Sequence, residues 1–248
     1  MSKRKCAFKF TVALTDEQLL KTLADTIKSC AQQAKTNGNT FRIGLSGGSL
    51  VQLLTNALVS HKFDTSSWVF FFCDERYVAP DHNDSTYWAY KSHLMKKVPS
   101  IVDGQFLKVN TSLPLDACAS DYESRVQSEF GCCKPEFDLL LLGMGPDGHT
   151  CSLFPEQPAS LTETKRLVMP IRNSPKPPPE RVTFTLPLIN NAKNVVFVVT
   201  GDSKMEVVKS VFLDIDKRYP AAWVEPTKGK LTLITDIGAG QALTEEAE

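Results

Sequence analysis

The chain has 248 residues, of which 42% are hydrophobic and 23% are charged, as in an ordinary globular protein with a sizeable core. Lys and Arg together number 28, as do Asp and Glu, which excludes a net field that would attract nucleic acid or an anionic membrane. No apolar run is long enough for a membrane span, no secretory signal is visible, and the seven cysteines lack metal-ligand spacing. We therefore expect a cytoplasmic protein with reduced thiols and no metal site.

Strand-like and helix-like segments alternate along the chain. The first segments are a strand at 7–14, a helix at 15–35 that ends at Asn37-Gly38, a strand at 41–45, and a helix from residue 50 that Ser49 would cap. Further strands are predicted at 68–76, 105–109, 137–145, 181–188, 194–201 and 230–236. Further helices are predicted at 86–98, 114–130 and 202–212, and in the C-terminal tail.

This alternation predicts one α/β domain over residues 1–248, with a mostly parallel sheet covered by helices on both faces. Prolines crowd the region between residues 155 and 179, which we expect to be a long functional loop. In such a sheet, ligands bind where the strands end at their carboxyl side. Four predicted strands end there in glycine turns or charged residues, namely at 46–49, 74–76, 143–149 and 201–204.

The first of these ends, Ser46, Gly47, Gly48 and Ser49, joins a strand to a helix. Its backbone amides and the helix N-terminus suit a phosphate, although a tight turn with a serine cap is an equal alternative. The same residues fit the G-x-S-x-G nucleophile elbow of serine hydrolases. That fold needs several strands before its serine, and only one predicted strand precedes Ser46, which disfavours the elbow.

Residues 143–148 fit the G-x-G-x-x-G dinucleotide pattern, but no long amphipathic helix follows them. The glycines more plausibly shape a turn that aims His149 from the tip of an apolar strand. His149 is then either a structural histidine or a general base whose ring Asp147 orients. Cys151 has nothing cationic beside it in sequence, so a small buried thiol is favoured over a nucleophile.

Several basic residues are candidates for binding an anion. Arg76 either pairs with a neighbouring acid, Asp74 or Glu75, or donates to a phosphate. Lys204 falls in the first turn of a predicted helix, where the helix dipole disfavours a cation, and this hints at an anionic partner. Lys176 and Arg181 flank a proline cluster that would stiffen a loop over the site, unless it is an ordinary surface loop.

Five segments together resemble the 6-phosphogluconolactonases, and the animal enzymes most of all: SGGS (46–49), CDERYVAPDHNDSTY (73–87), FDLLLLGMGPDGHTCSLFP (137–155), SPKPPPERVTFTLP (174–187) and TGDSK (200–204). The match runs in order from about residue 8 to residue 240. The resemblance implies hydrolysis of 6-phospho-D-glucono-1,5-lactone, the second step of the oxidative pentose phosphate pathway, without a metal or organic cofactor. It also implies a Rossmann-like fold shared with aminosugar-phosphate deaminases and ribose-5-phosphate isomerase.

The resemblance further implies roles for individual residues. His149 matches the proposed general base, while the 46–49 loop and Arg76 match positions that line the phosphate and substrate pocket. Lys204 matches a phosphate-binding lysine of the related deaminases, and Arg181 lies in the family's SPKPPP segment. The deaminases carry an acid shortly after the equivalent histidine, but here no acid follows before Glu156, which favours the lactonase.

Three alternative functions stay open at this point. A deaminase or isomerase would use Asp74 to abstract a carbon-bound proton. An esterase would use Ser46 or Cys151 as its nucleophile. A sugar-phosphate sensor would bind without turnover, and the Asp147–His149 turn disfavours that reading.

Overall fold

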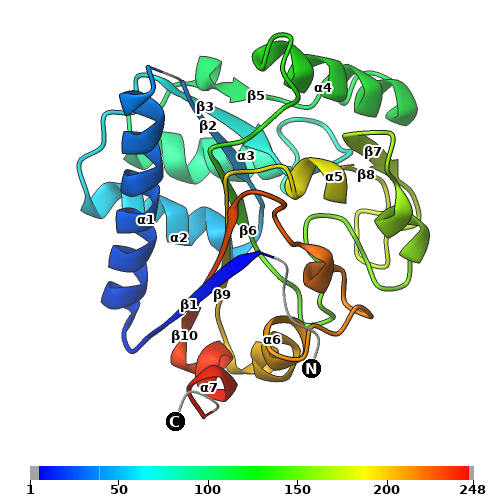
Figure 1. The fold of residues 1–248 in the computed structure, drawn as a ribbon. Coiled ribbons are helices and arrows are strands. Elements are labelled where there is room, and N and C mark those ends of the chain that lie inside the picture. Colours follow the sequence, from blue (N-terminus) through cyan, green and yellow to red (C-terminus); the bar gives the residue numbers. More distant parts are fainter. Residues whose placement is uncertain (1–5, 39, 246–248) are drawn as a thin grey trace.

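The structure is a computed structural model that describes residues 6–38 and 40–245 (Figure 1); the basic start, residues 1–5, lies outside the described residues. Its central sheet has seven strands, all parallel. In spatial order they are β1 (Ala7–Ala13), β10 (Lys230–Asp236), β9 (Asn194–Val199), β6 (Leu139–Leu142), β2 (Phe41–Leu45), β3 (Trp68–Phe72) and β5 (Phe106–Leu107). The predicted mostly parallel sheet is confirmed.

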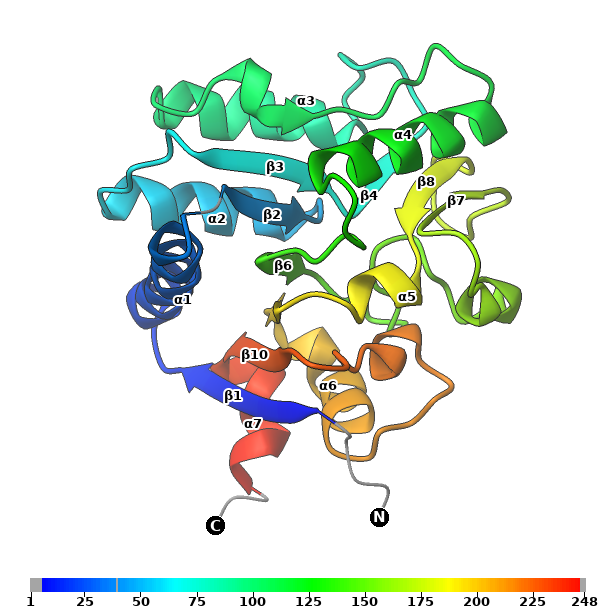
Figure 2. The same ribbon diagram turned by 45° about the horizontal axis from the view of Figure 1, so that its top comes forward.

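Helices cover both faces of this sheet (Figure 2). On one face lie α1 (Asp16–Thr36), α2 (Ser49–Ser60) and α3 (Thr86–Tyr90), which continues as a π-helical turn, η1 (Lys91–Met95). On the other lie α4 (Leu115–Glu129), α5 (Leu186–Ile189), α6 (Met205–Phe212) and α7 (Ile237–Glu245). Short 3₁₀ turns are η2 (Asp103–Gln105), η3 (Pro158–Thr162), η4 (Asp202–Lys204) and η5 (Pro220–Trp223).

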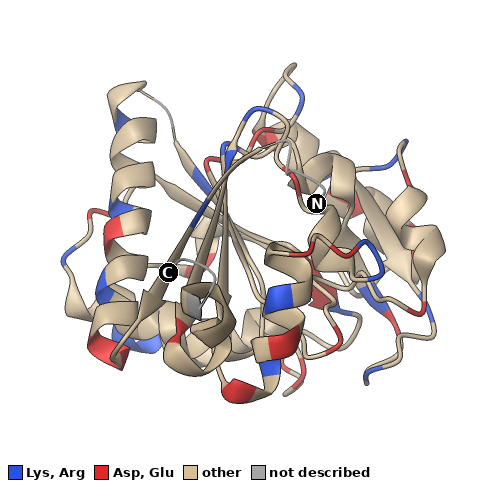
Figure 3. Ribbon diagram, turned by 60° about the horizontal axis from the view of Figure 1, so that its bottom comes forward, with Lys and Arg blue, Asp and Glu red and all other residues tan. Residues whose placement is uncertain are grey.

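The four leucines of β6 explain the uninterrupted apolar run in its sequence. Leu139 and Leu141 pack in the core beneath α1, α2 and α3, whereas Leu140 and Leu142 pack in the core on the opposite face. A strand that is buried on both sides needs apolar residues at every position. Charged residues of both signs lie mainly on the helices and loops (Figure 3), and β6 and β9 carry none. No helix of the described residues is long and apolar enough to cross a bilayer.

A second sheet was not predicted from the sequence. It is antiparallel, with β4 (Asp74–Arg76), β8 (Arg181–Phe184) and β7 (Val168–Ile171) in that order. The strand predicted at 68–76 is therefore two strands, and the backbone of Cys73 is the point of transfer. Its N–H donates to Leu45 O of the central sheet at 2.8 Å, and its C=O accepts from Phe184 N of the second sheet at 2.7 Å.

Other boundaries also differ from the predictions. The predicted loop at 155–179 contains η3 and the whole of β7, and the strand predicted at 181–188 ends at Phe184, because Pro187 fits the first turn of α5. Ser49 is the first residue of α2 rather than its cap; Gly48 is the cap residue, with a φ of +70°. Lys204 closes η4 and caps α6, so it precedes that helix instead of lying in its first turn.

The strand order reverses at the centre of the large sheet. From β2 the chain continues to β3 and β5 on one side, and from its neighbour β6 it continues to β9 and β10 on the other. The connections therefore diverge at the carboxyl ends of β2 and β6, which leaves a crevice between them. The loops that follow these two strands are the predicted 46–49 and 143–149 segments.

Candidate active site

A cavity of about 150 Å³ opens at this crevice. Its lining includes nine of the residues singled out in the sequence: Ser46, Gly47, Gly48, Ser49, Asp74, Arg76, His149, Arg181 and Lys204. Asp147 and Lys176 join them through direct contacts with each other and with His149. The structure thus brings together residues from five separate parts of the chain. Among the described residues, no group of three or more His, Cys, Asp or Glu side chains could hold a metal ion.

His149 is held at the end of a tight turn. Its Nδ1 lies 2.5 Å from Asp147 Oδ1, so the ring's other nitrogen, Nε2, is the one left for a ligand. The turn is closed by Thr150 Oγ1, which donates to Gly143 O at 2.9 Å, and by Gly145 N, which donates to His149 O at 3.0 Å. A side chain at Gly145 would overlap both the imidazole and the carboxylate. The contact between Asp147 and His149 therefore requires glycine at position 145.

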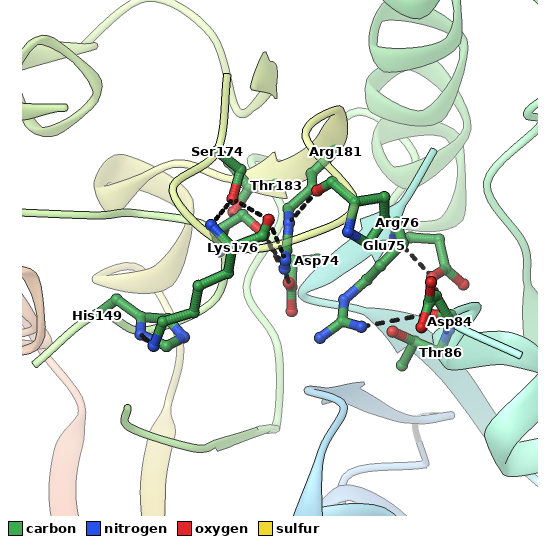
Figure 4. Close-up of polar contacts among 12 residues, drawn as sticks. Asp74, Glu75, Arg76, Asp84, Thr86, His149, Ser174, Lys176, Arg181 and Thr183 are labelled. Atoms are coloured by element: carbon green, nitrogen blue, oxygen red, sulfur yellow. Dashed lines mark hydrogen bonds and ion pairs between the residues drawn. The ribbon is translucent and has the colours of Figure 1, made fainter. Parts of the chain in front are cut away.

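Lys176 completes a cluster of three charged or titratable groups. Its Nζ lies 3.0 Å from Asp147 Oδ2 and 3.1 Å from His149 Nδ1, and Figure 4 shows its side chain extending to the imidazole. Burial raises the pKa of Asp147, but the hydrogen bond with His149 and the Lys176 cation lower it more, so the pKa lies well below its ordinary value. Asp147 is therefore an anion at neutral pH.

Arg181 is buried under the proline-rich loop, with 3% of its surface exposed. Its Nε donates to Pro178 O at 3.2 Å, and its Nη2 donates to Pro177 O at 2.9 Å and to Lys176 O at 3.1 Å. Its Nη1 lies 3.9 Å from Asp74 Oδ2. Most of the guanidinium N–H groups are thus taken by the protein, and a contact with a substrate phosphate stays a prediction.

Arg76 and Lys204 are the cations that the protein leaves least occupied. Arg76 Nη1 donates to Asp84 O at 3.2 Å, and its buried Nε has no hydrogen-bond partner in the described structure. No ion pair joins Arg76 to Asp74 within residues 6–38 and 40–245. Lys204 is half-buried, and no ion pair or hydrogen bond of its ammonium occurs in those same ranges; burial lowers its pKa, which Asp236 only partly offsets. An anionic ligand would satisfy both cations.

The loop at 46–49 supplies polar groups to the same cavity. Ser46 Oγ is buried and has no hydrogen-bond partner among the described residues. Ser46 is therefore not bonded to His149, as a serine nucleophile would be to its base. At the start of α2, Val51 N donates to Gly48 O at 3.2 Å, while the amides before it precede the helical hydrogen bonds, and such a helix N-terminus suits an anion.

Two residues of the site were missed in the sequence. Ser152 Oγ donates to Asp74 Oδ2 at 2.8 Å and lies 3.4 Å from Arg181 Nη1, so it links the acid to the arginine. Phe154 stacks on His149, with 4.8 Å between ring centroids and 28° between ring planes. The Arg181 guanidinium lies over the same phenylalanine ring, 5.5 Å from its centroid. The available signal in the sequence was the spacing of Ser152 and Phe154, a polar and an aromatic residue two positions apart, shortly after His149.

Glu75, considered in the sequence only as a possible ion-pair partner of Arg76, has a different role. Its buried carboxylate accepts from Thr86 N at 2.7 Å and from Tyr87 N at 2.8 Å, which caps the start of α3, and from Arg76 N at 2.7 Å. Burial raises its pKa, although these backbone hydrogen bonds act in the opposite direction. Glu75 therefore supports the wall that carries Arg76 and does not pair with the Arg76 guanidinium.

Comparison with known proteins agrees with the fold. The model of the glucosamine-6-phosphate isomerases/6-phosphogluconolactonase family matches residues 14–233. A Drosophila melanogaster protein named probable 6-phosphogluconolactonase is 62% identical over 243 residues, covering 98% of each chain, and human 6-phosphogluconolactonase is 46% identical over 211 residues, covering 82% of this chain and 81% of its own. The solved 6-phosphogluconolactonase from Trypanosoma cruzi has a TM-score of 0.81 at 27% identity, over 95% of this chain and 97% of that one. The predicted Rossmann-like fold and the likeness to animal enzymes are confirmed, and the chain belongs to the glucosamine-6-phosphate isomerase/6-phosphogluconolactonase family.

Proposed function

We propose that the protein is a hydrolase that opens 6-phospho-D-glucono-1,5-lactone to 6-phospho-D-gluconate, in the oxidative pentose phosphate pathway. The names of the relatives and of the solved neighbours support this activity. The observation that carries the proposal is the composition of one cavity: the His149–Asp147 pair shares it with Lys204 and Arg76, two cations without an ion pair in the described structure. A base and a phosphate anchor are what a phosphorylated lactone needs.

In this reaction His149 is the general base. Its Nε2 takes a proton from water while the water oxygen attacks the lactone carbonyl carbon. When the tetrahedral intermediate collapses, the bond from that carbon to the ring oxygen breaks, and the imidazolium returns the proton to this oxygen as it becomes a hydroxyl. Asp147 fixes the ring and stabilises the imidazolium. A base of this kind contributes about 10²- to 10⁴-fold in rate.

The phosphate is anchored away from the reacting carbon. We place it against Lys204, Arg76 and the amides at the start of α2, which together provide positive charge and N–H donors. Binding energy gained there orients the lactone against His149, and this lowers the entropic part of the barrier. Asp74, for which the sequence left open a catalytic role or a pairing with Arg76, is bound by Ser152, which supports a role in holding the cavity wall.

A deaminase or isomerase reaction is less well supported. It would use Asp74 to abstract a proton from carbon, but one Asp74 oxygen is bound by Ser152 and lies near Arg181. The side chain that stacks on His149 is aromatic, and the first acid after it, Glu156, is exposed. These features give His149 no acidic partner besides Asp147 in that segment.

The test is lactone hydrolysis by wild type and by His149→Ala, with the spontaneous reaction subtracted. We expect the wild type to accelerate hydrolysis and the variant, still folded, to lose at least about 100-fold in kcat. His61→Ala is the matched control, because His61 lies at the far end of α2 from the cavity, and it should keep full activity. Release of ammonia from glucosamine 6-phosphate, without lactone hydrolysis, would refute the proposal.

A further inference from the structure

The proline-rich loop is folded back on itself above the catalytic pair. Ser174 N donates to Pro179 O at 2.9 Å, which closes the base of the loop, and Ser174 Oγ donates to Lys176 O at 2.9 Å. Three successive carbonyls, those of Lys176, Pro177 and Pro178, then face the Arg181 guanidinium. The conformation of the loop is therefore held by the buried Arg181 guanidinium at the start of β8, together with the hydrogen bonds of Ser174.

Lys176 is the residue that this fixed loop presents to the site. Its backbone carbonyl is bound to Arg181, while its ammonium reaches Asp147 Oδ2 and the edge of His149. The side chain is 38% exposed, so it has a route to water and is not forced into the contact by burial alone. A freely moving lysine would lose side-chain entropy on making this contact, and a loop held by Arg181 reduces that cost.

Arg181 reaches the catalytic histidine by a second route. Phe154 lies between the two, with its ring stacked on the imidazole and under the guanidinium. Arg181 thus contacts both groups that pack around His149: the loop that carries Lys176, and the ring of Phe154. Neither route leaves the guanidinium free to bind a ligand.

We propose that Lys176 and Arg181 are positioning residues that hold the Asp147–His149 pair in its reactive geometry, and that neither binds the substrate phosphate. The inference rests on the proposed lactonase function and replaces the phosphate-binding role expected for both residues from the sequence. Arg181 fixes the loop. Lys176 and His149 contact different oxygens of the Asp147 carboxylate: Lys176 Nζ contacts Oδ2, and His149 Nδ1 contacts Oδ1.

This arrangement has an electrostatic signature. Asp147 and Lys176 contact the imidazole directly, and the other charged groups that line the cavity are Asp74, Arg76, Arg181 and Lys204. Removing the Lys176 charge takes away a cation 3.1 Å from His149 Nδ1. His149 then becomes the remaining partner of the Asp147 carboxylate in this cluster. The protonated imidazole is stabilised, so the acidic limb of the pH–rate profile moves to higher pH, by about one unit for a contact this close in a partly open site.

The decisive variant is Lys176→Met, assayed as the full chain for kcat, KM, pH dependence and inhibition by inorganic phosphate. We expect the shifted acidic limb and a several-fold lower kcat, with KM and the phosphate inhibition constant within about threefold of wild type. Lys176→Arg, which keeps a cation, should restore the wild-type limb. Arg172→Met is the control, since Arg172 precedes the same loop but pairs with the exposed Asp116.

Arg181 provides the second arm. Arg181→Lys keeps the charge but offers one nitrogen where two guanidinium nitrogens make three hydrogen bonds to the loop, so we expect it to lose activity and to show the same shifted limb as Lys176→Met. If the Arg181→Lys variant does not fold, the Lys176→Met measurements still test the proposal. A large rise in KM and in the phosphate inhibition constant, with an unshifted pH profile, overturns the proposal. A wild type that does not accelerate lactone hydrolysis above the spontaneous rate would instead overturn the lactonase function itself.

Discussion

Replacing Lys204 by methionine separates binding of an anion from maintenance of the fold. Lys204 ends η4 at the mouth of the cavity and has no ion pair in the part of the chain that the structure describes. Burial disfavours its charged form, as the lowered pKa indicates. A basic group whose pKa is lowered in the folded state costs stability at every pH where it stays charged. Methionine, of similar length, removes that cost.

The expected loss of activity follows from one charge-assisted contact to the phosphate. Such a hydrogen bond contributes about 1.5–3 kcal/mol, and about 1.4 kcal/mol is a factor of ten, so kcat/KM should fall by about 10- to 100-fold. The phosphate lies away from the reacting carbon, and a large part of the loss should therefore be in KM. Stability should move in the opposite direction, with a melting temperature equal to or above that of the wild type.

The assay is steady-state lactone hydrolysis with inorganic phosphate as a competitive inhibitor, together with a thermal melt. Lys209→Met is the control, because Lys209 lies on α6 but forms an exposed pair with Asp214, and such pairs contribute about 0–1 kcal/mol. The reasoning is wrong if Lys204→Met keeps wild-type kcat/KM and phosphate inhibition, or if it melts well below the control.

Three further predictions concern the fold around the pair. Gly145→Ala should lower lactone hydrolysis by about 100-fold or more, since its methyl group would displace the His149 ring and the base supplies that much rate; an active variant would contradict this geometry. Glu75→Gln should destabilise the protein by about 1–3 kcal/mol in urea unfolding, because an amide NH₂ would then face backbone donors that now meet carboxylate oxygens; unchanged stability would exclude the capping role. Asp147→Asn should be less stable than wild type at pH 7, and because the folded-state pKa of Asp147 is lowered, the difference should be present above about pH 4 and shrink as the pH falls further; a difference independent of pH would refute the ion pairing.

Much of the fold could be predicted from the sequence because its determinants are local. The leucines of β6 and the apolar spacing of α1 each specify an element without reference to distant residues. The second sheet could not be predicted in this way. At Cys73 the chain passes from one sheet to the other inside a single apolar-to-charged run, and only the pairing of β4 with β8 reveals the change.

The same distinction holds within the candidate site. Asp147 and His149 are two residues apart on a glycine turn, so their pairing could be proposed from sequence spacing. Lys176 and Arg181 could be recognised as basic residues on a stiff loop, but Asp147 and Ser152, which they contact, lie in the distant segment that follows β6. Whether a cation faces a ligand or a carbonyl depends on tertiary contacts, which sequence spacing does not contain.

The position of β1 has a consequence for how the chain is made. Among the described elements β1 comes first in the sequence, yet it lies at the edge of the sheet and pairs with β10, so that Ala7 is opposite Lys230. Its neighbour follows all the other strands in the sequence, and such distant pairing is slow to form. Until β10 is made, both edges of β1 are unpaired, and unpaired strand edges promote aggregation. Truncation before Lys230 would therefore remove β10 and leave β1 without a neighbour in the sheet.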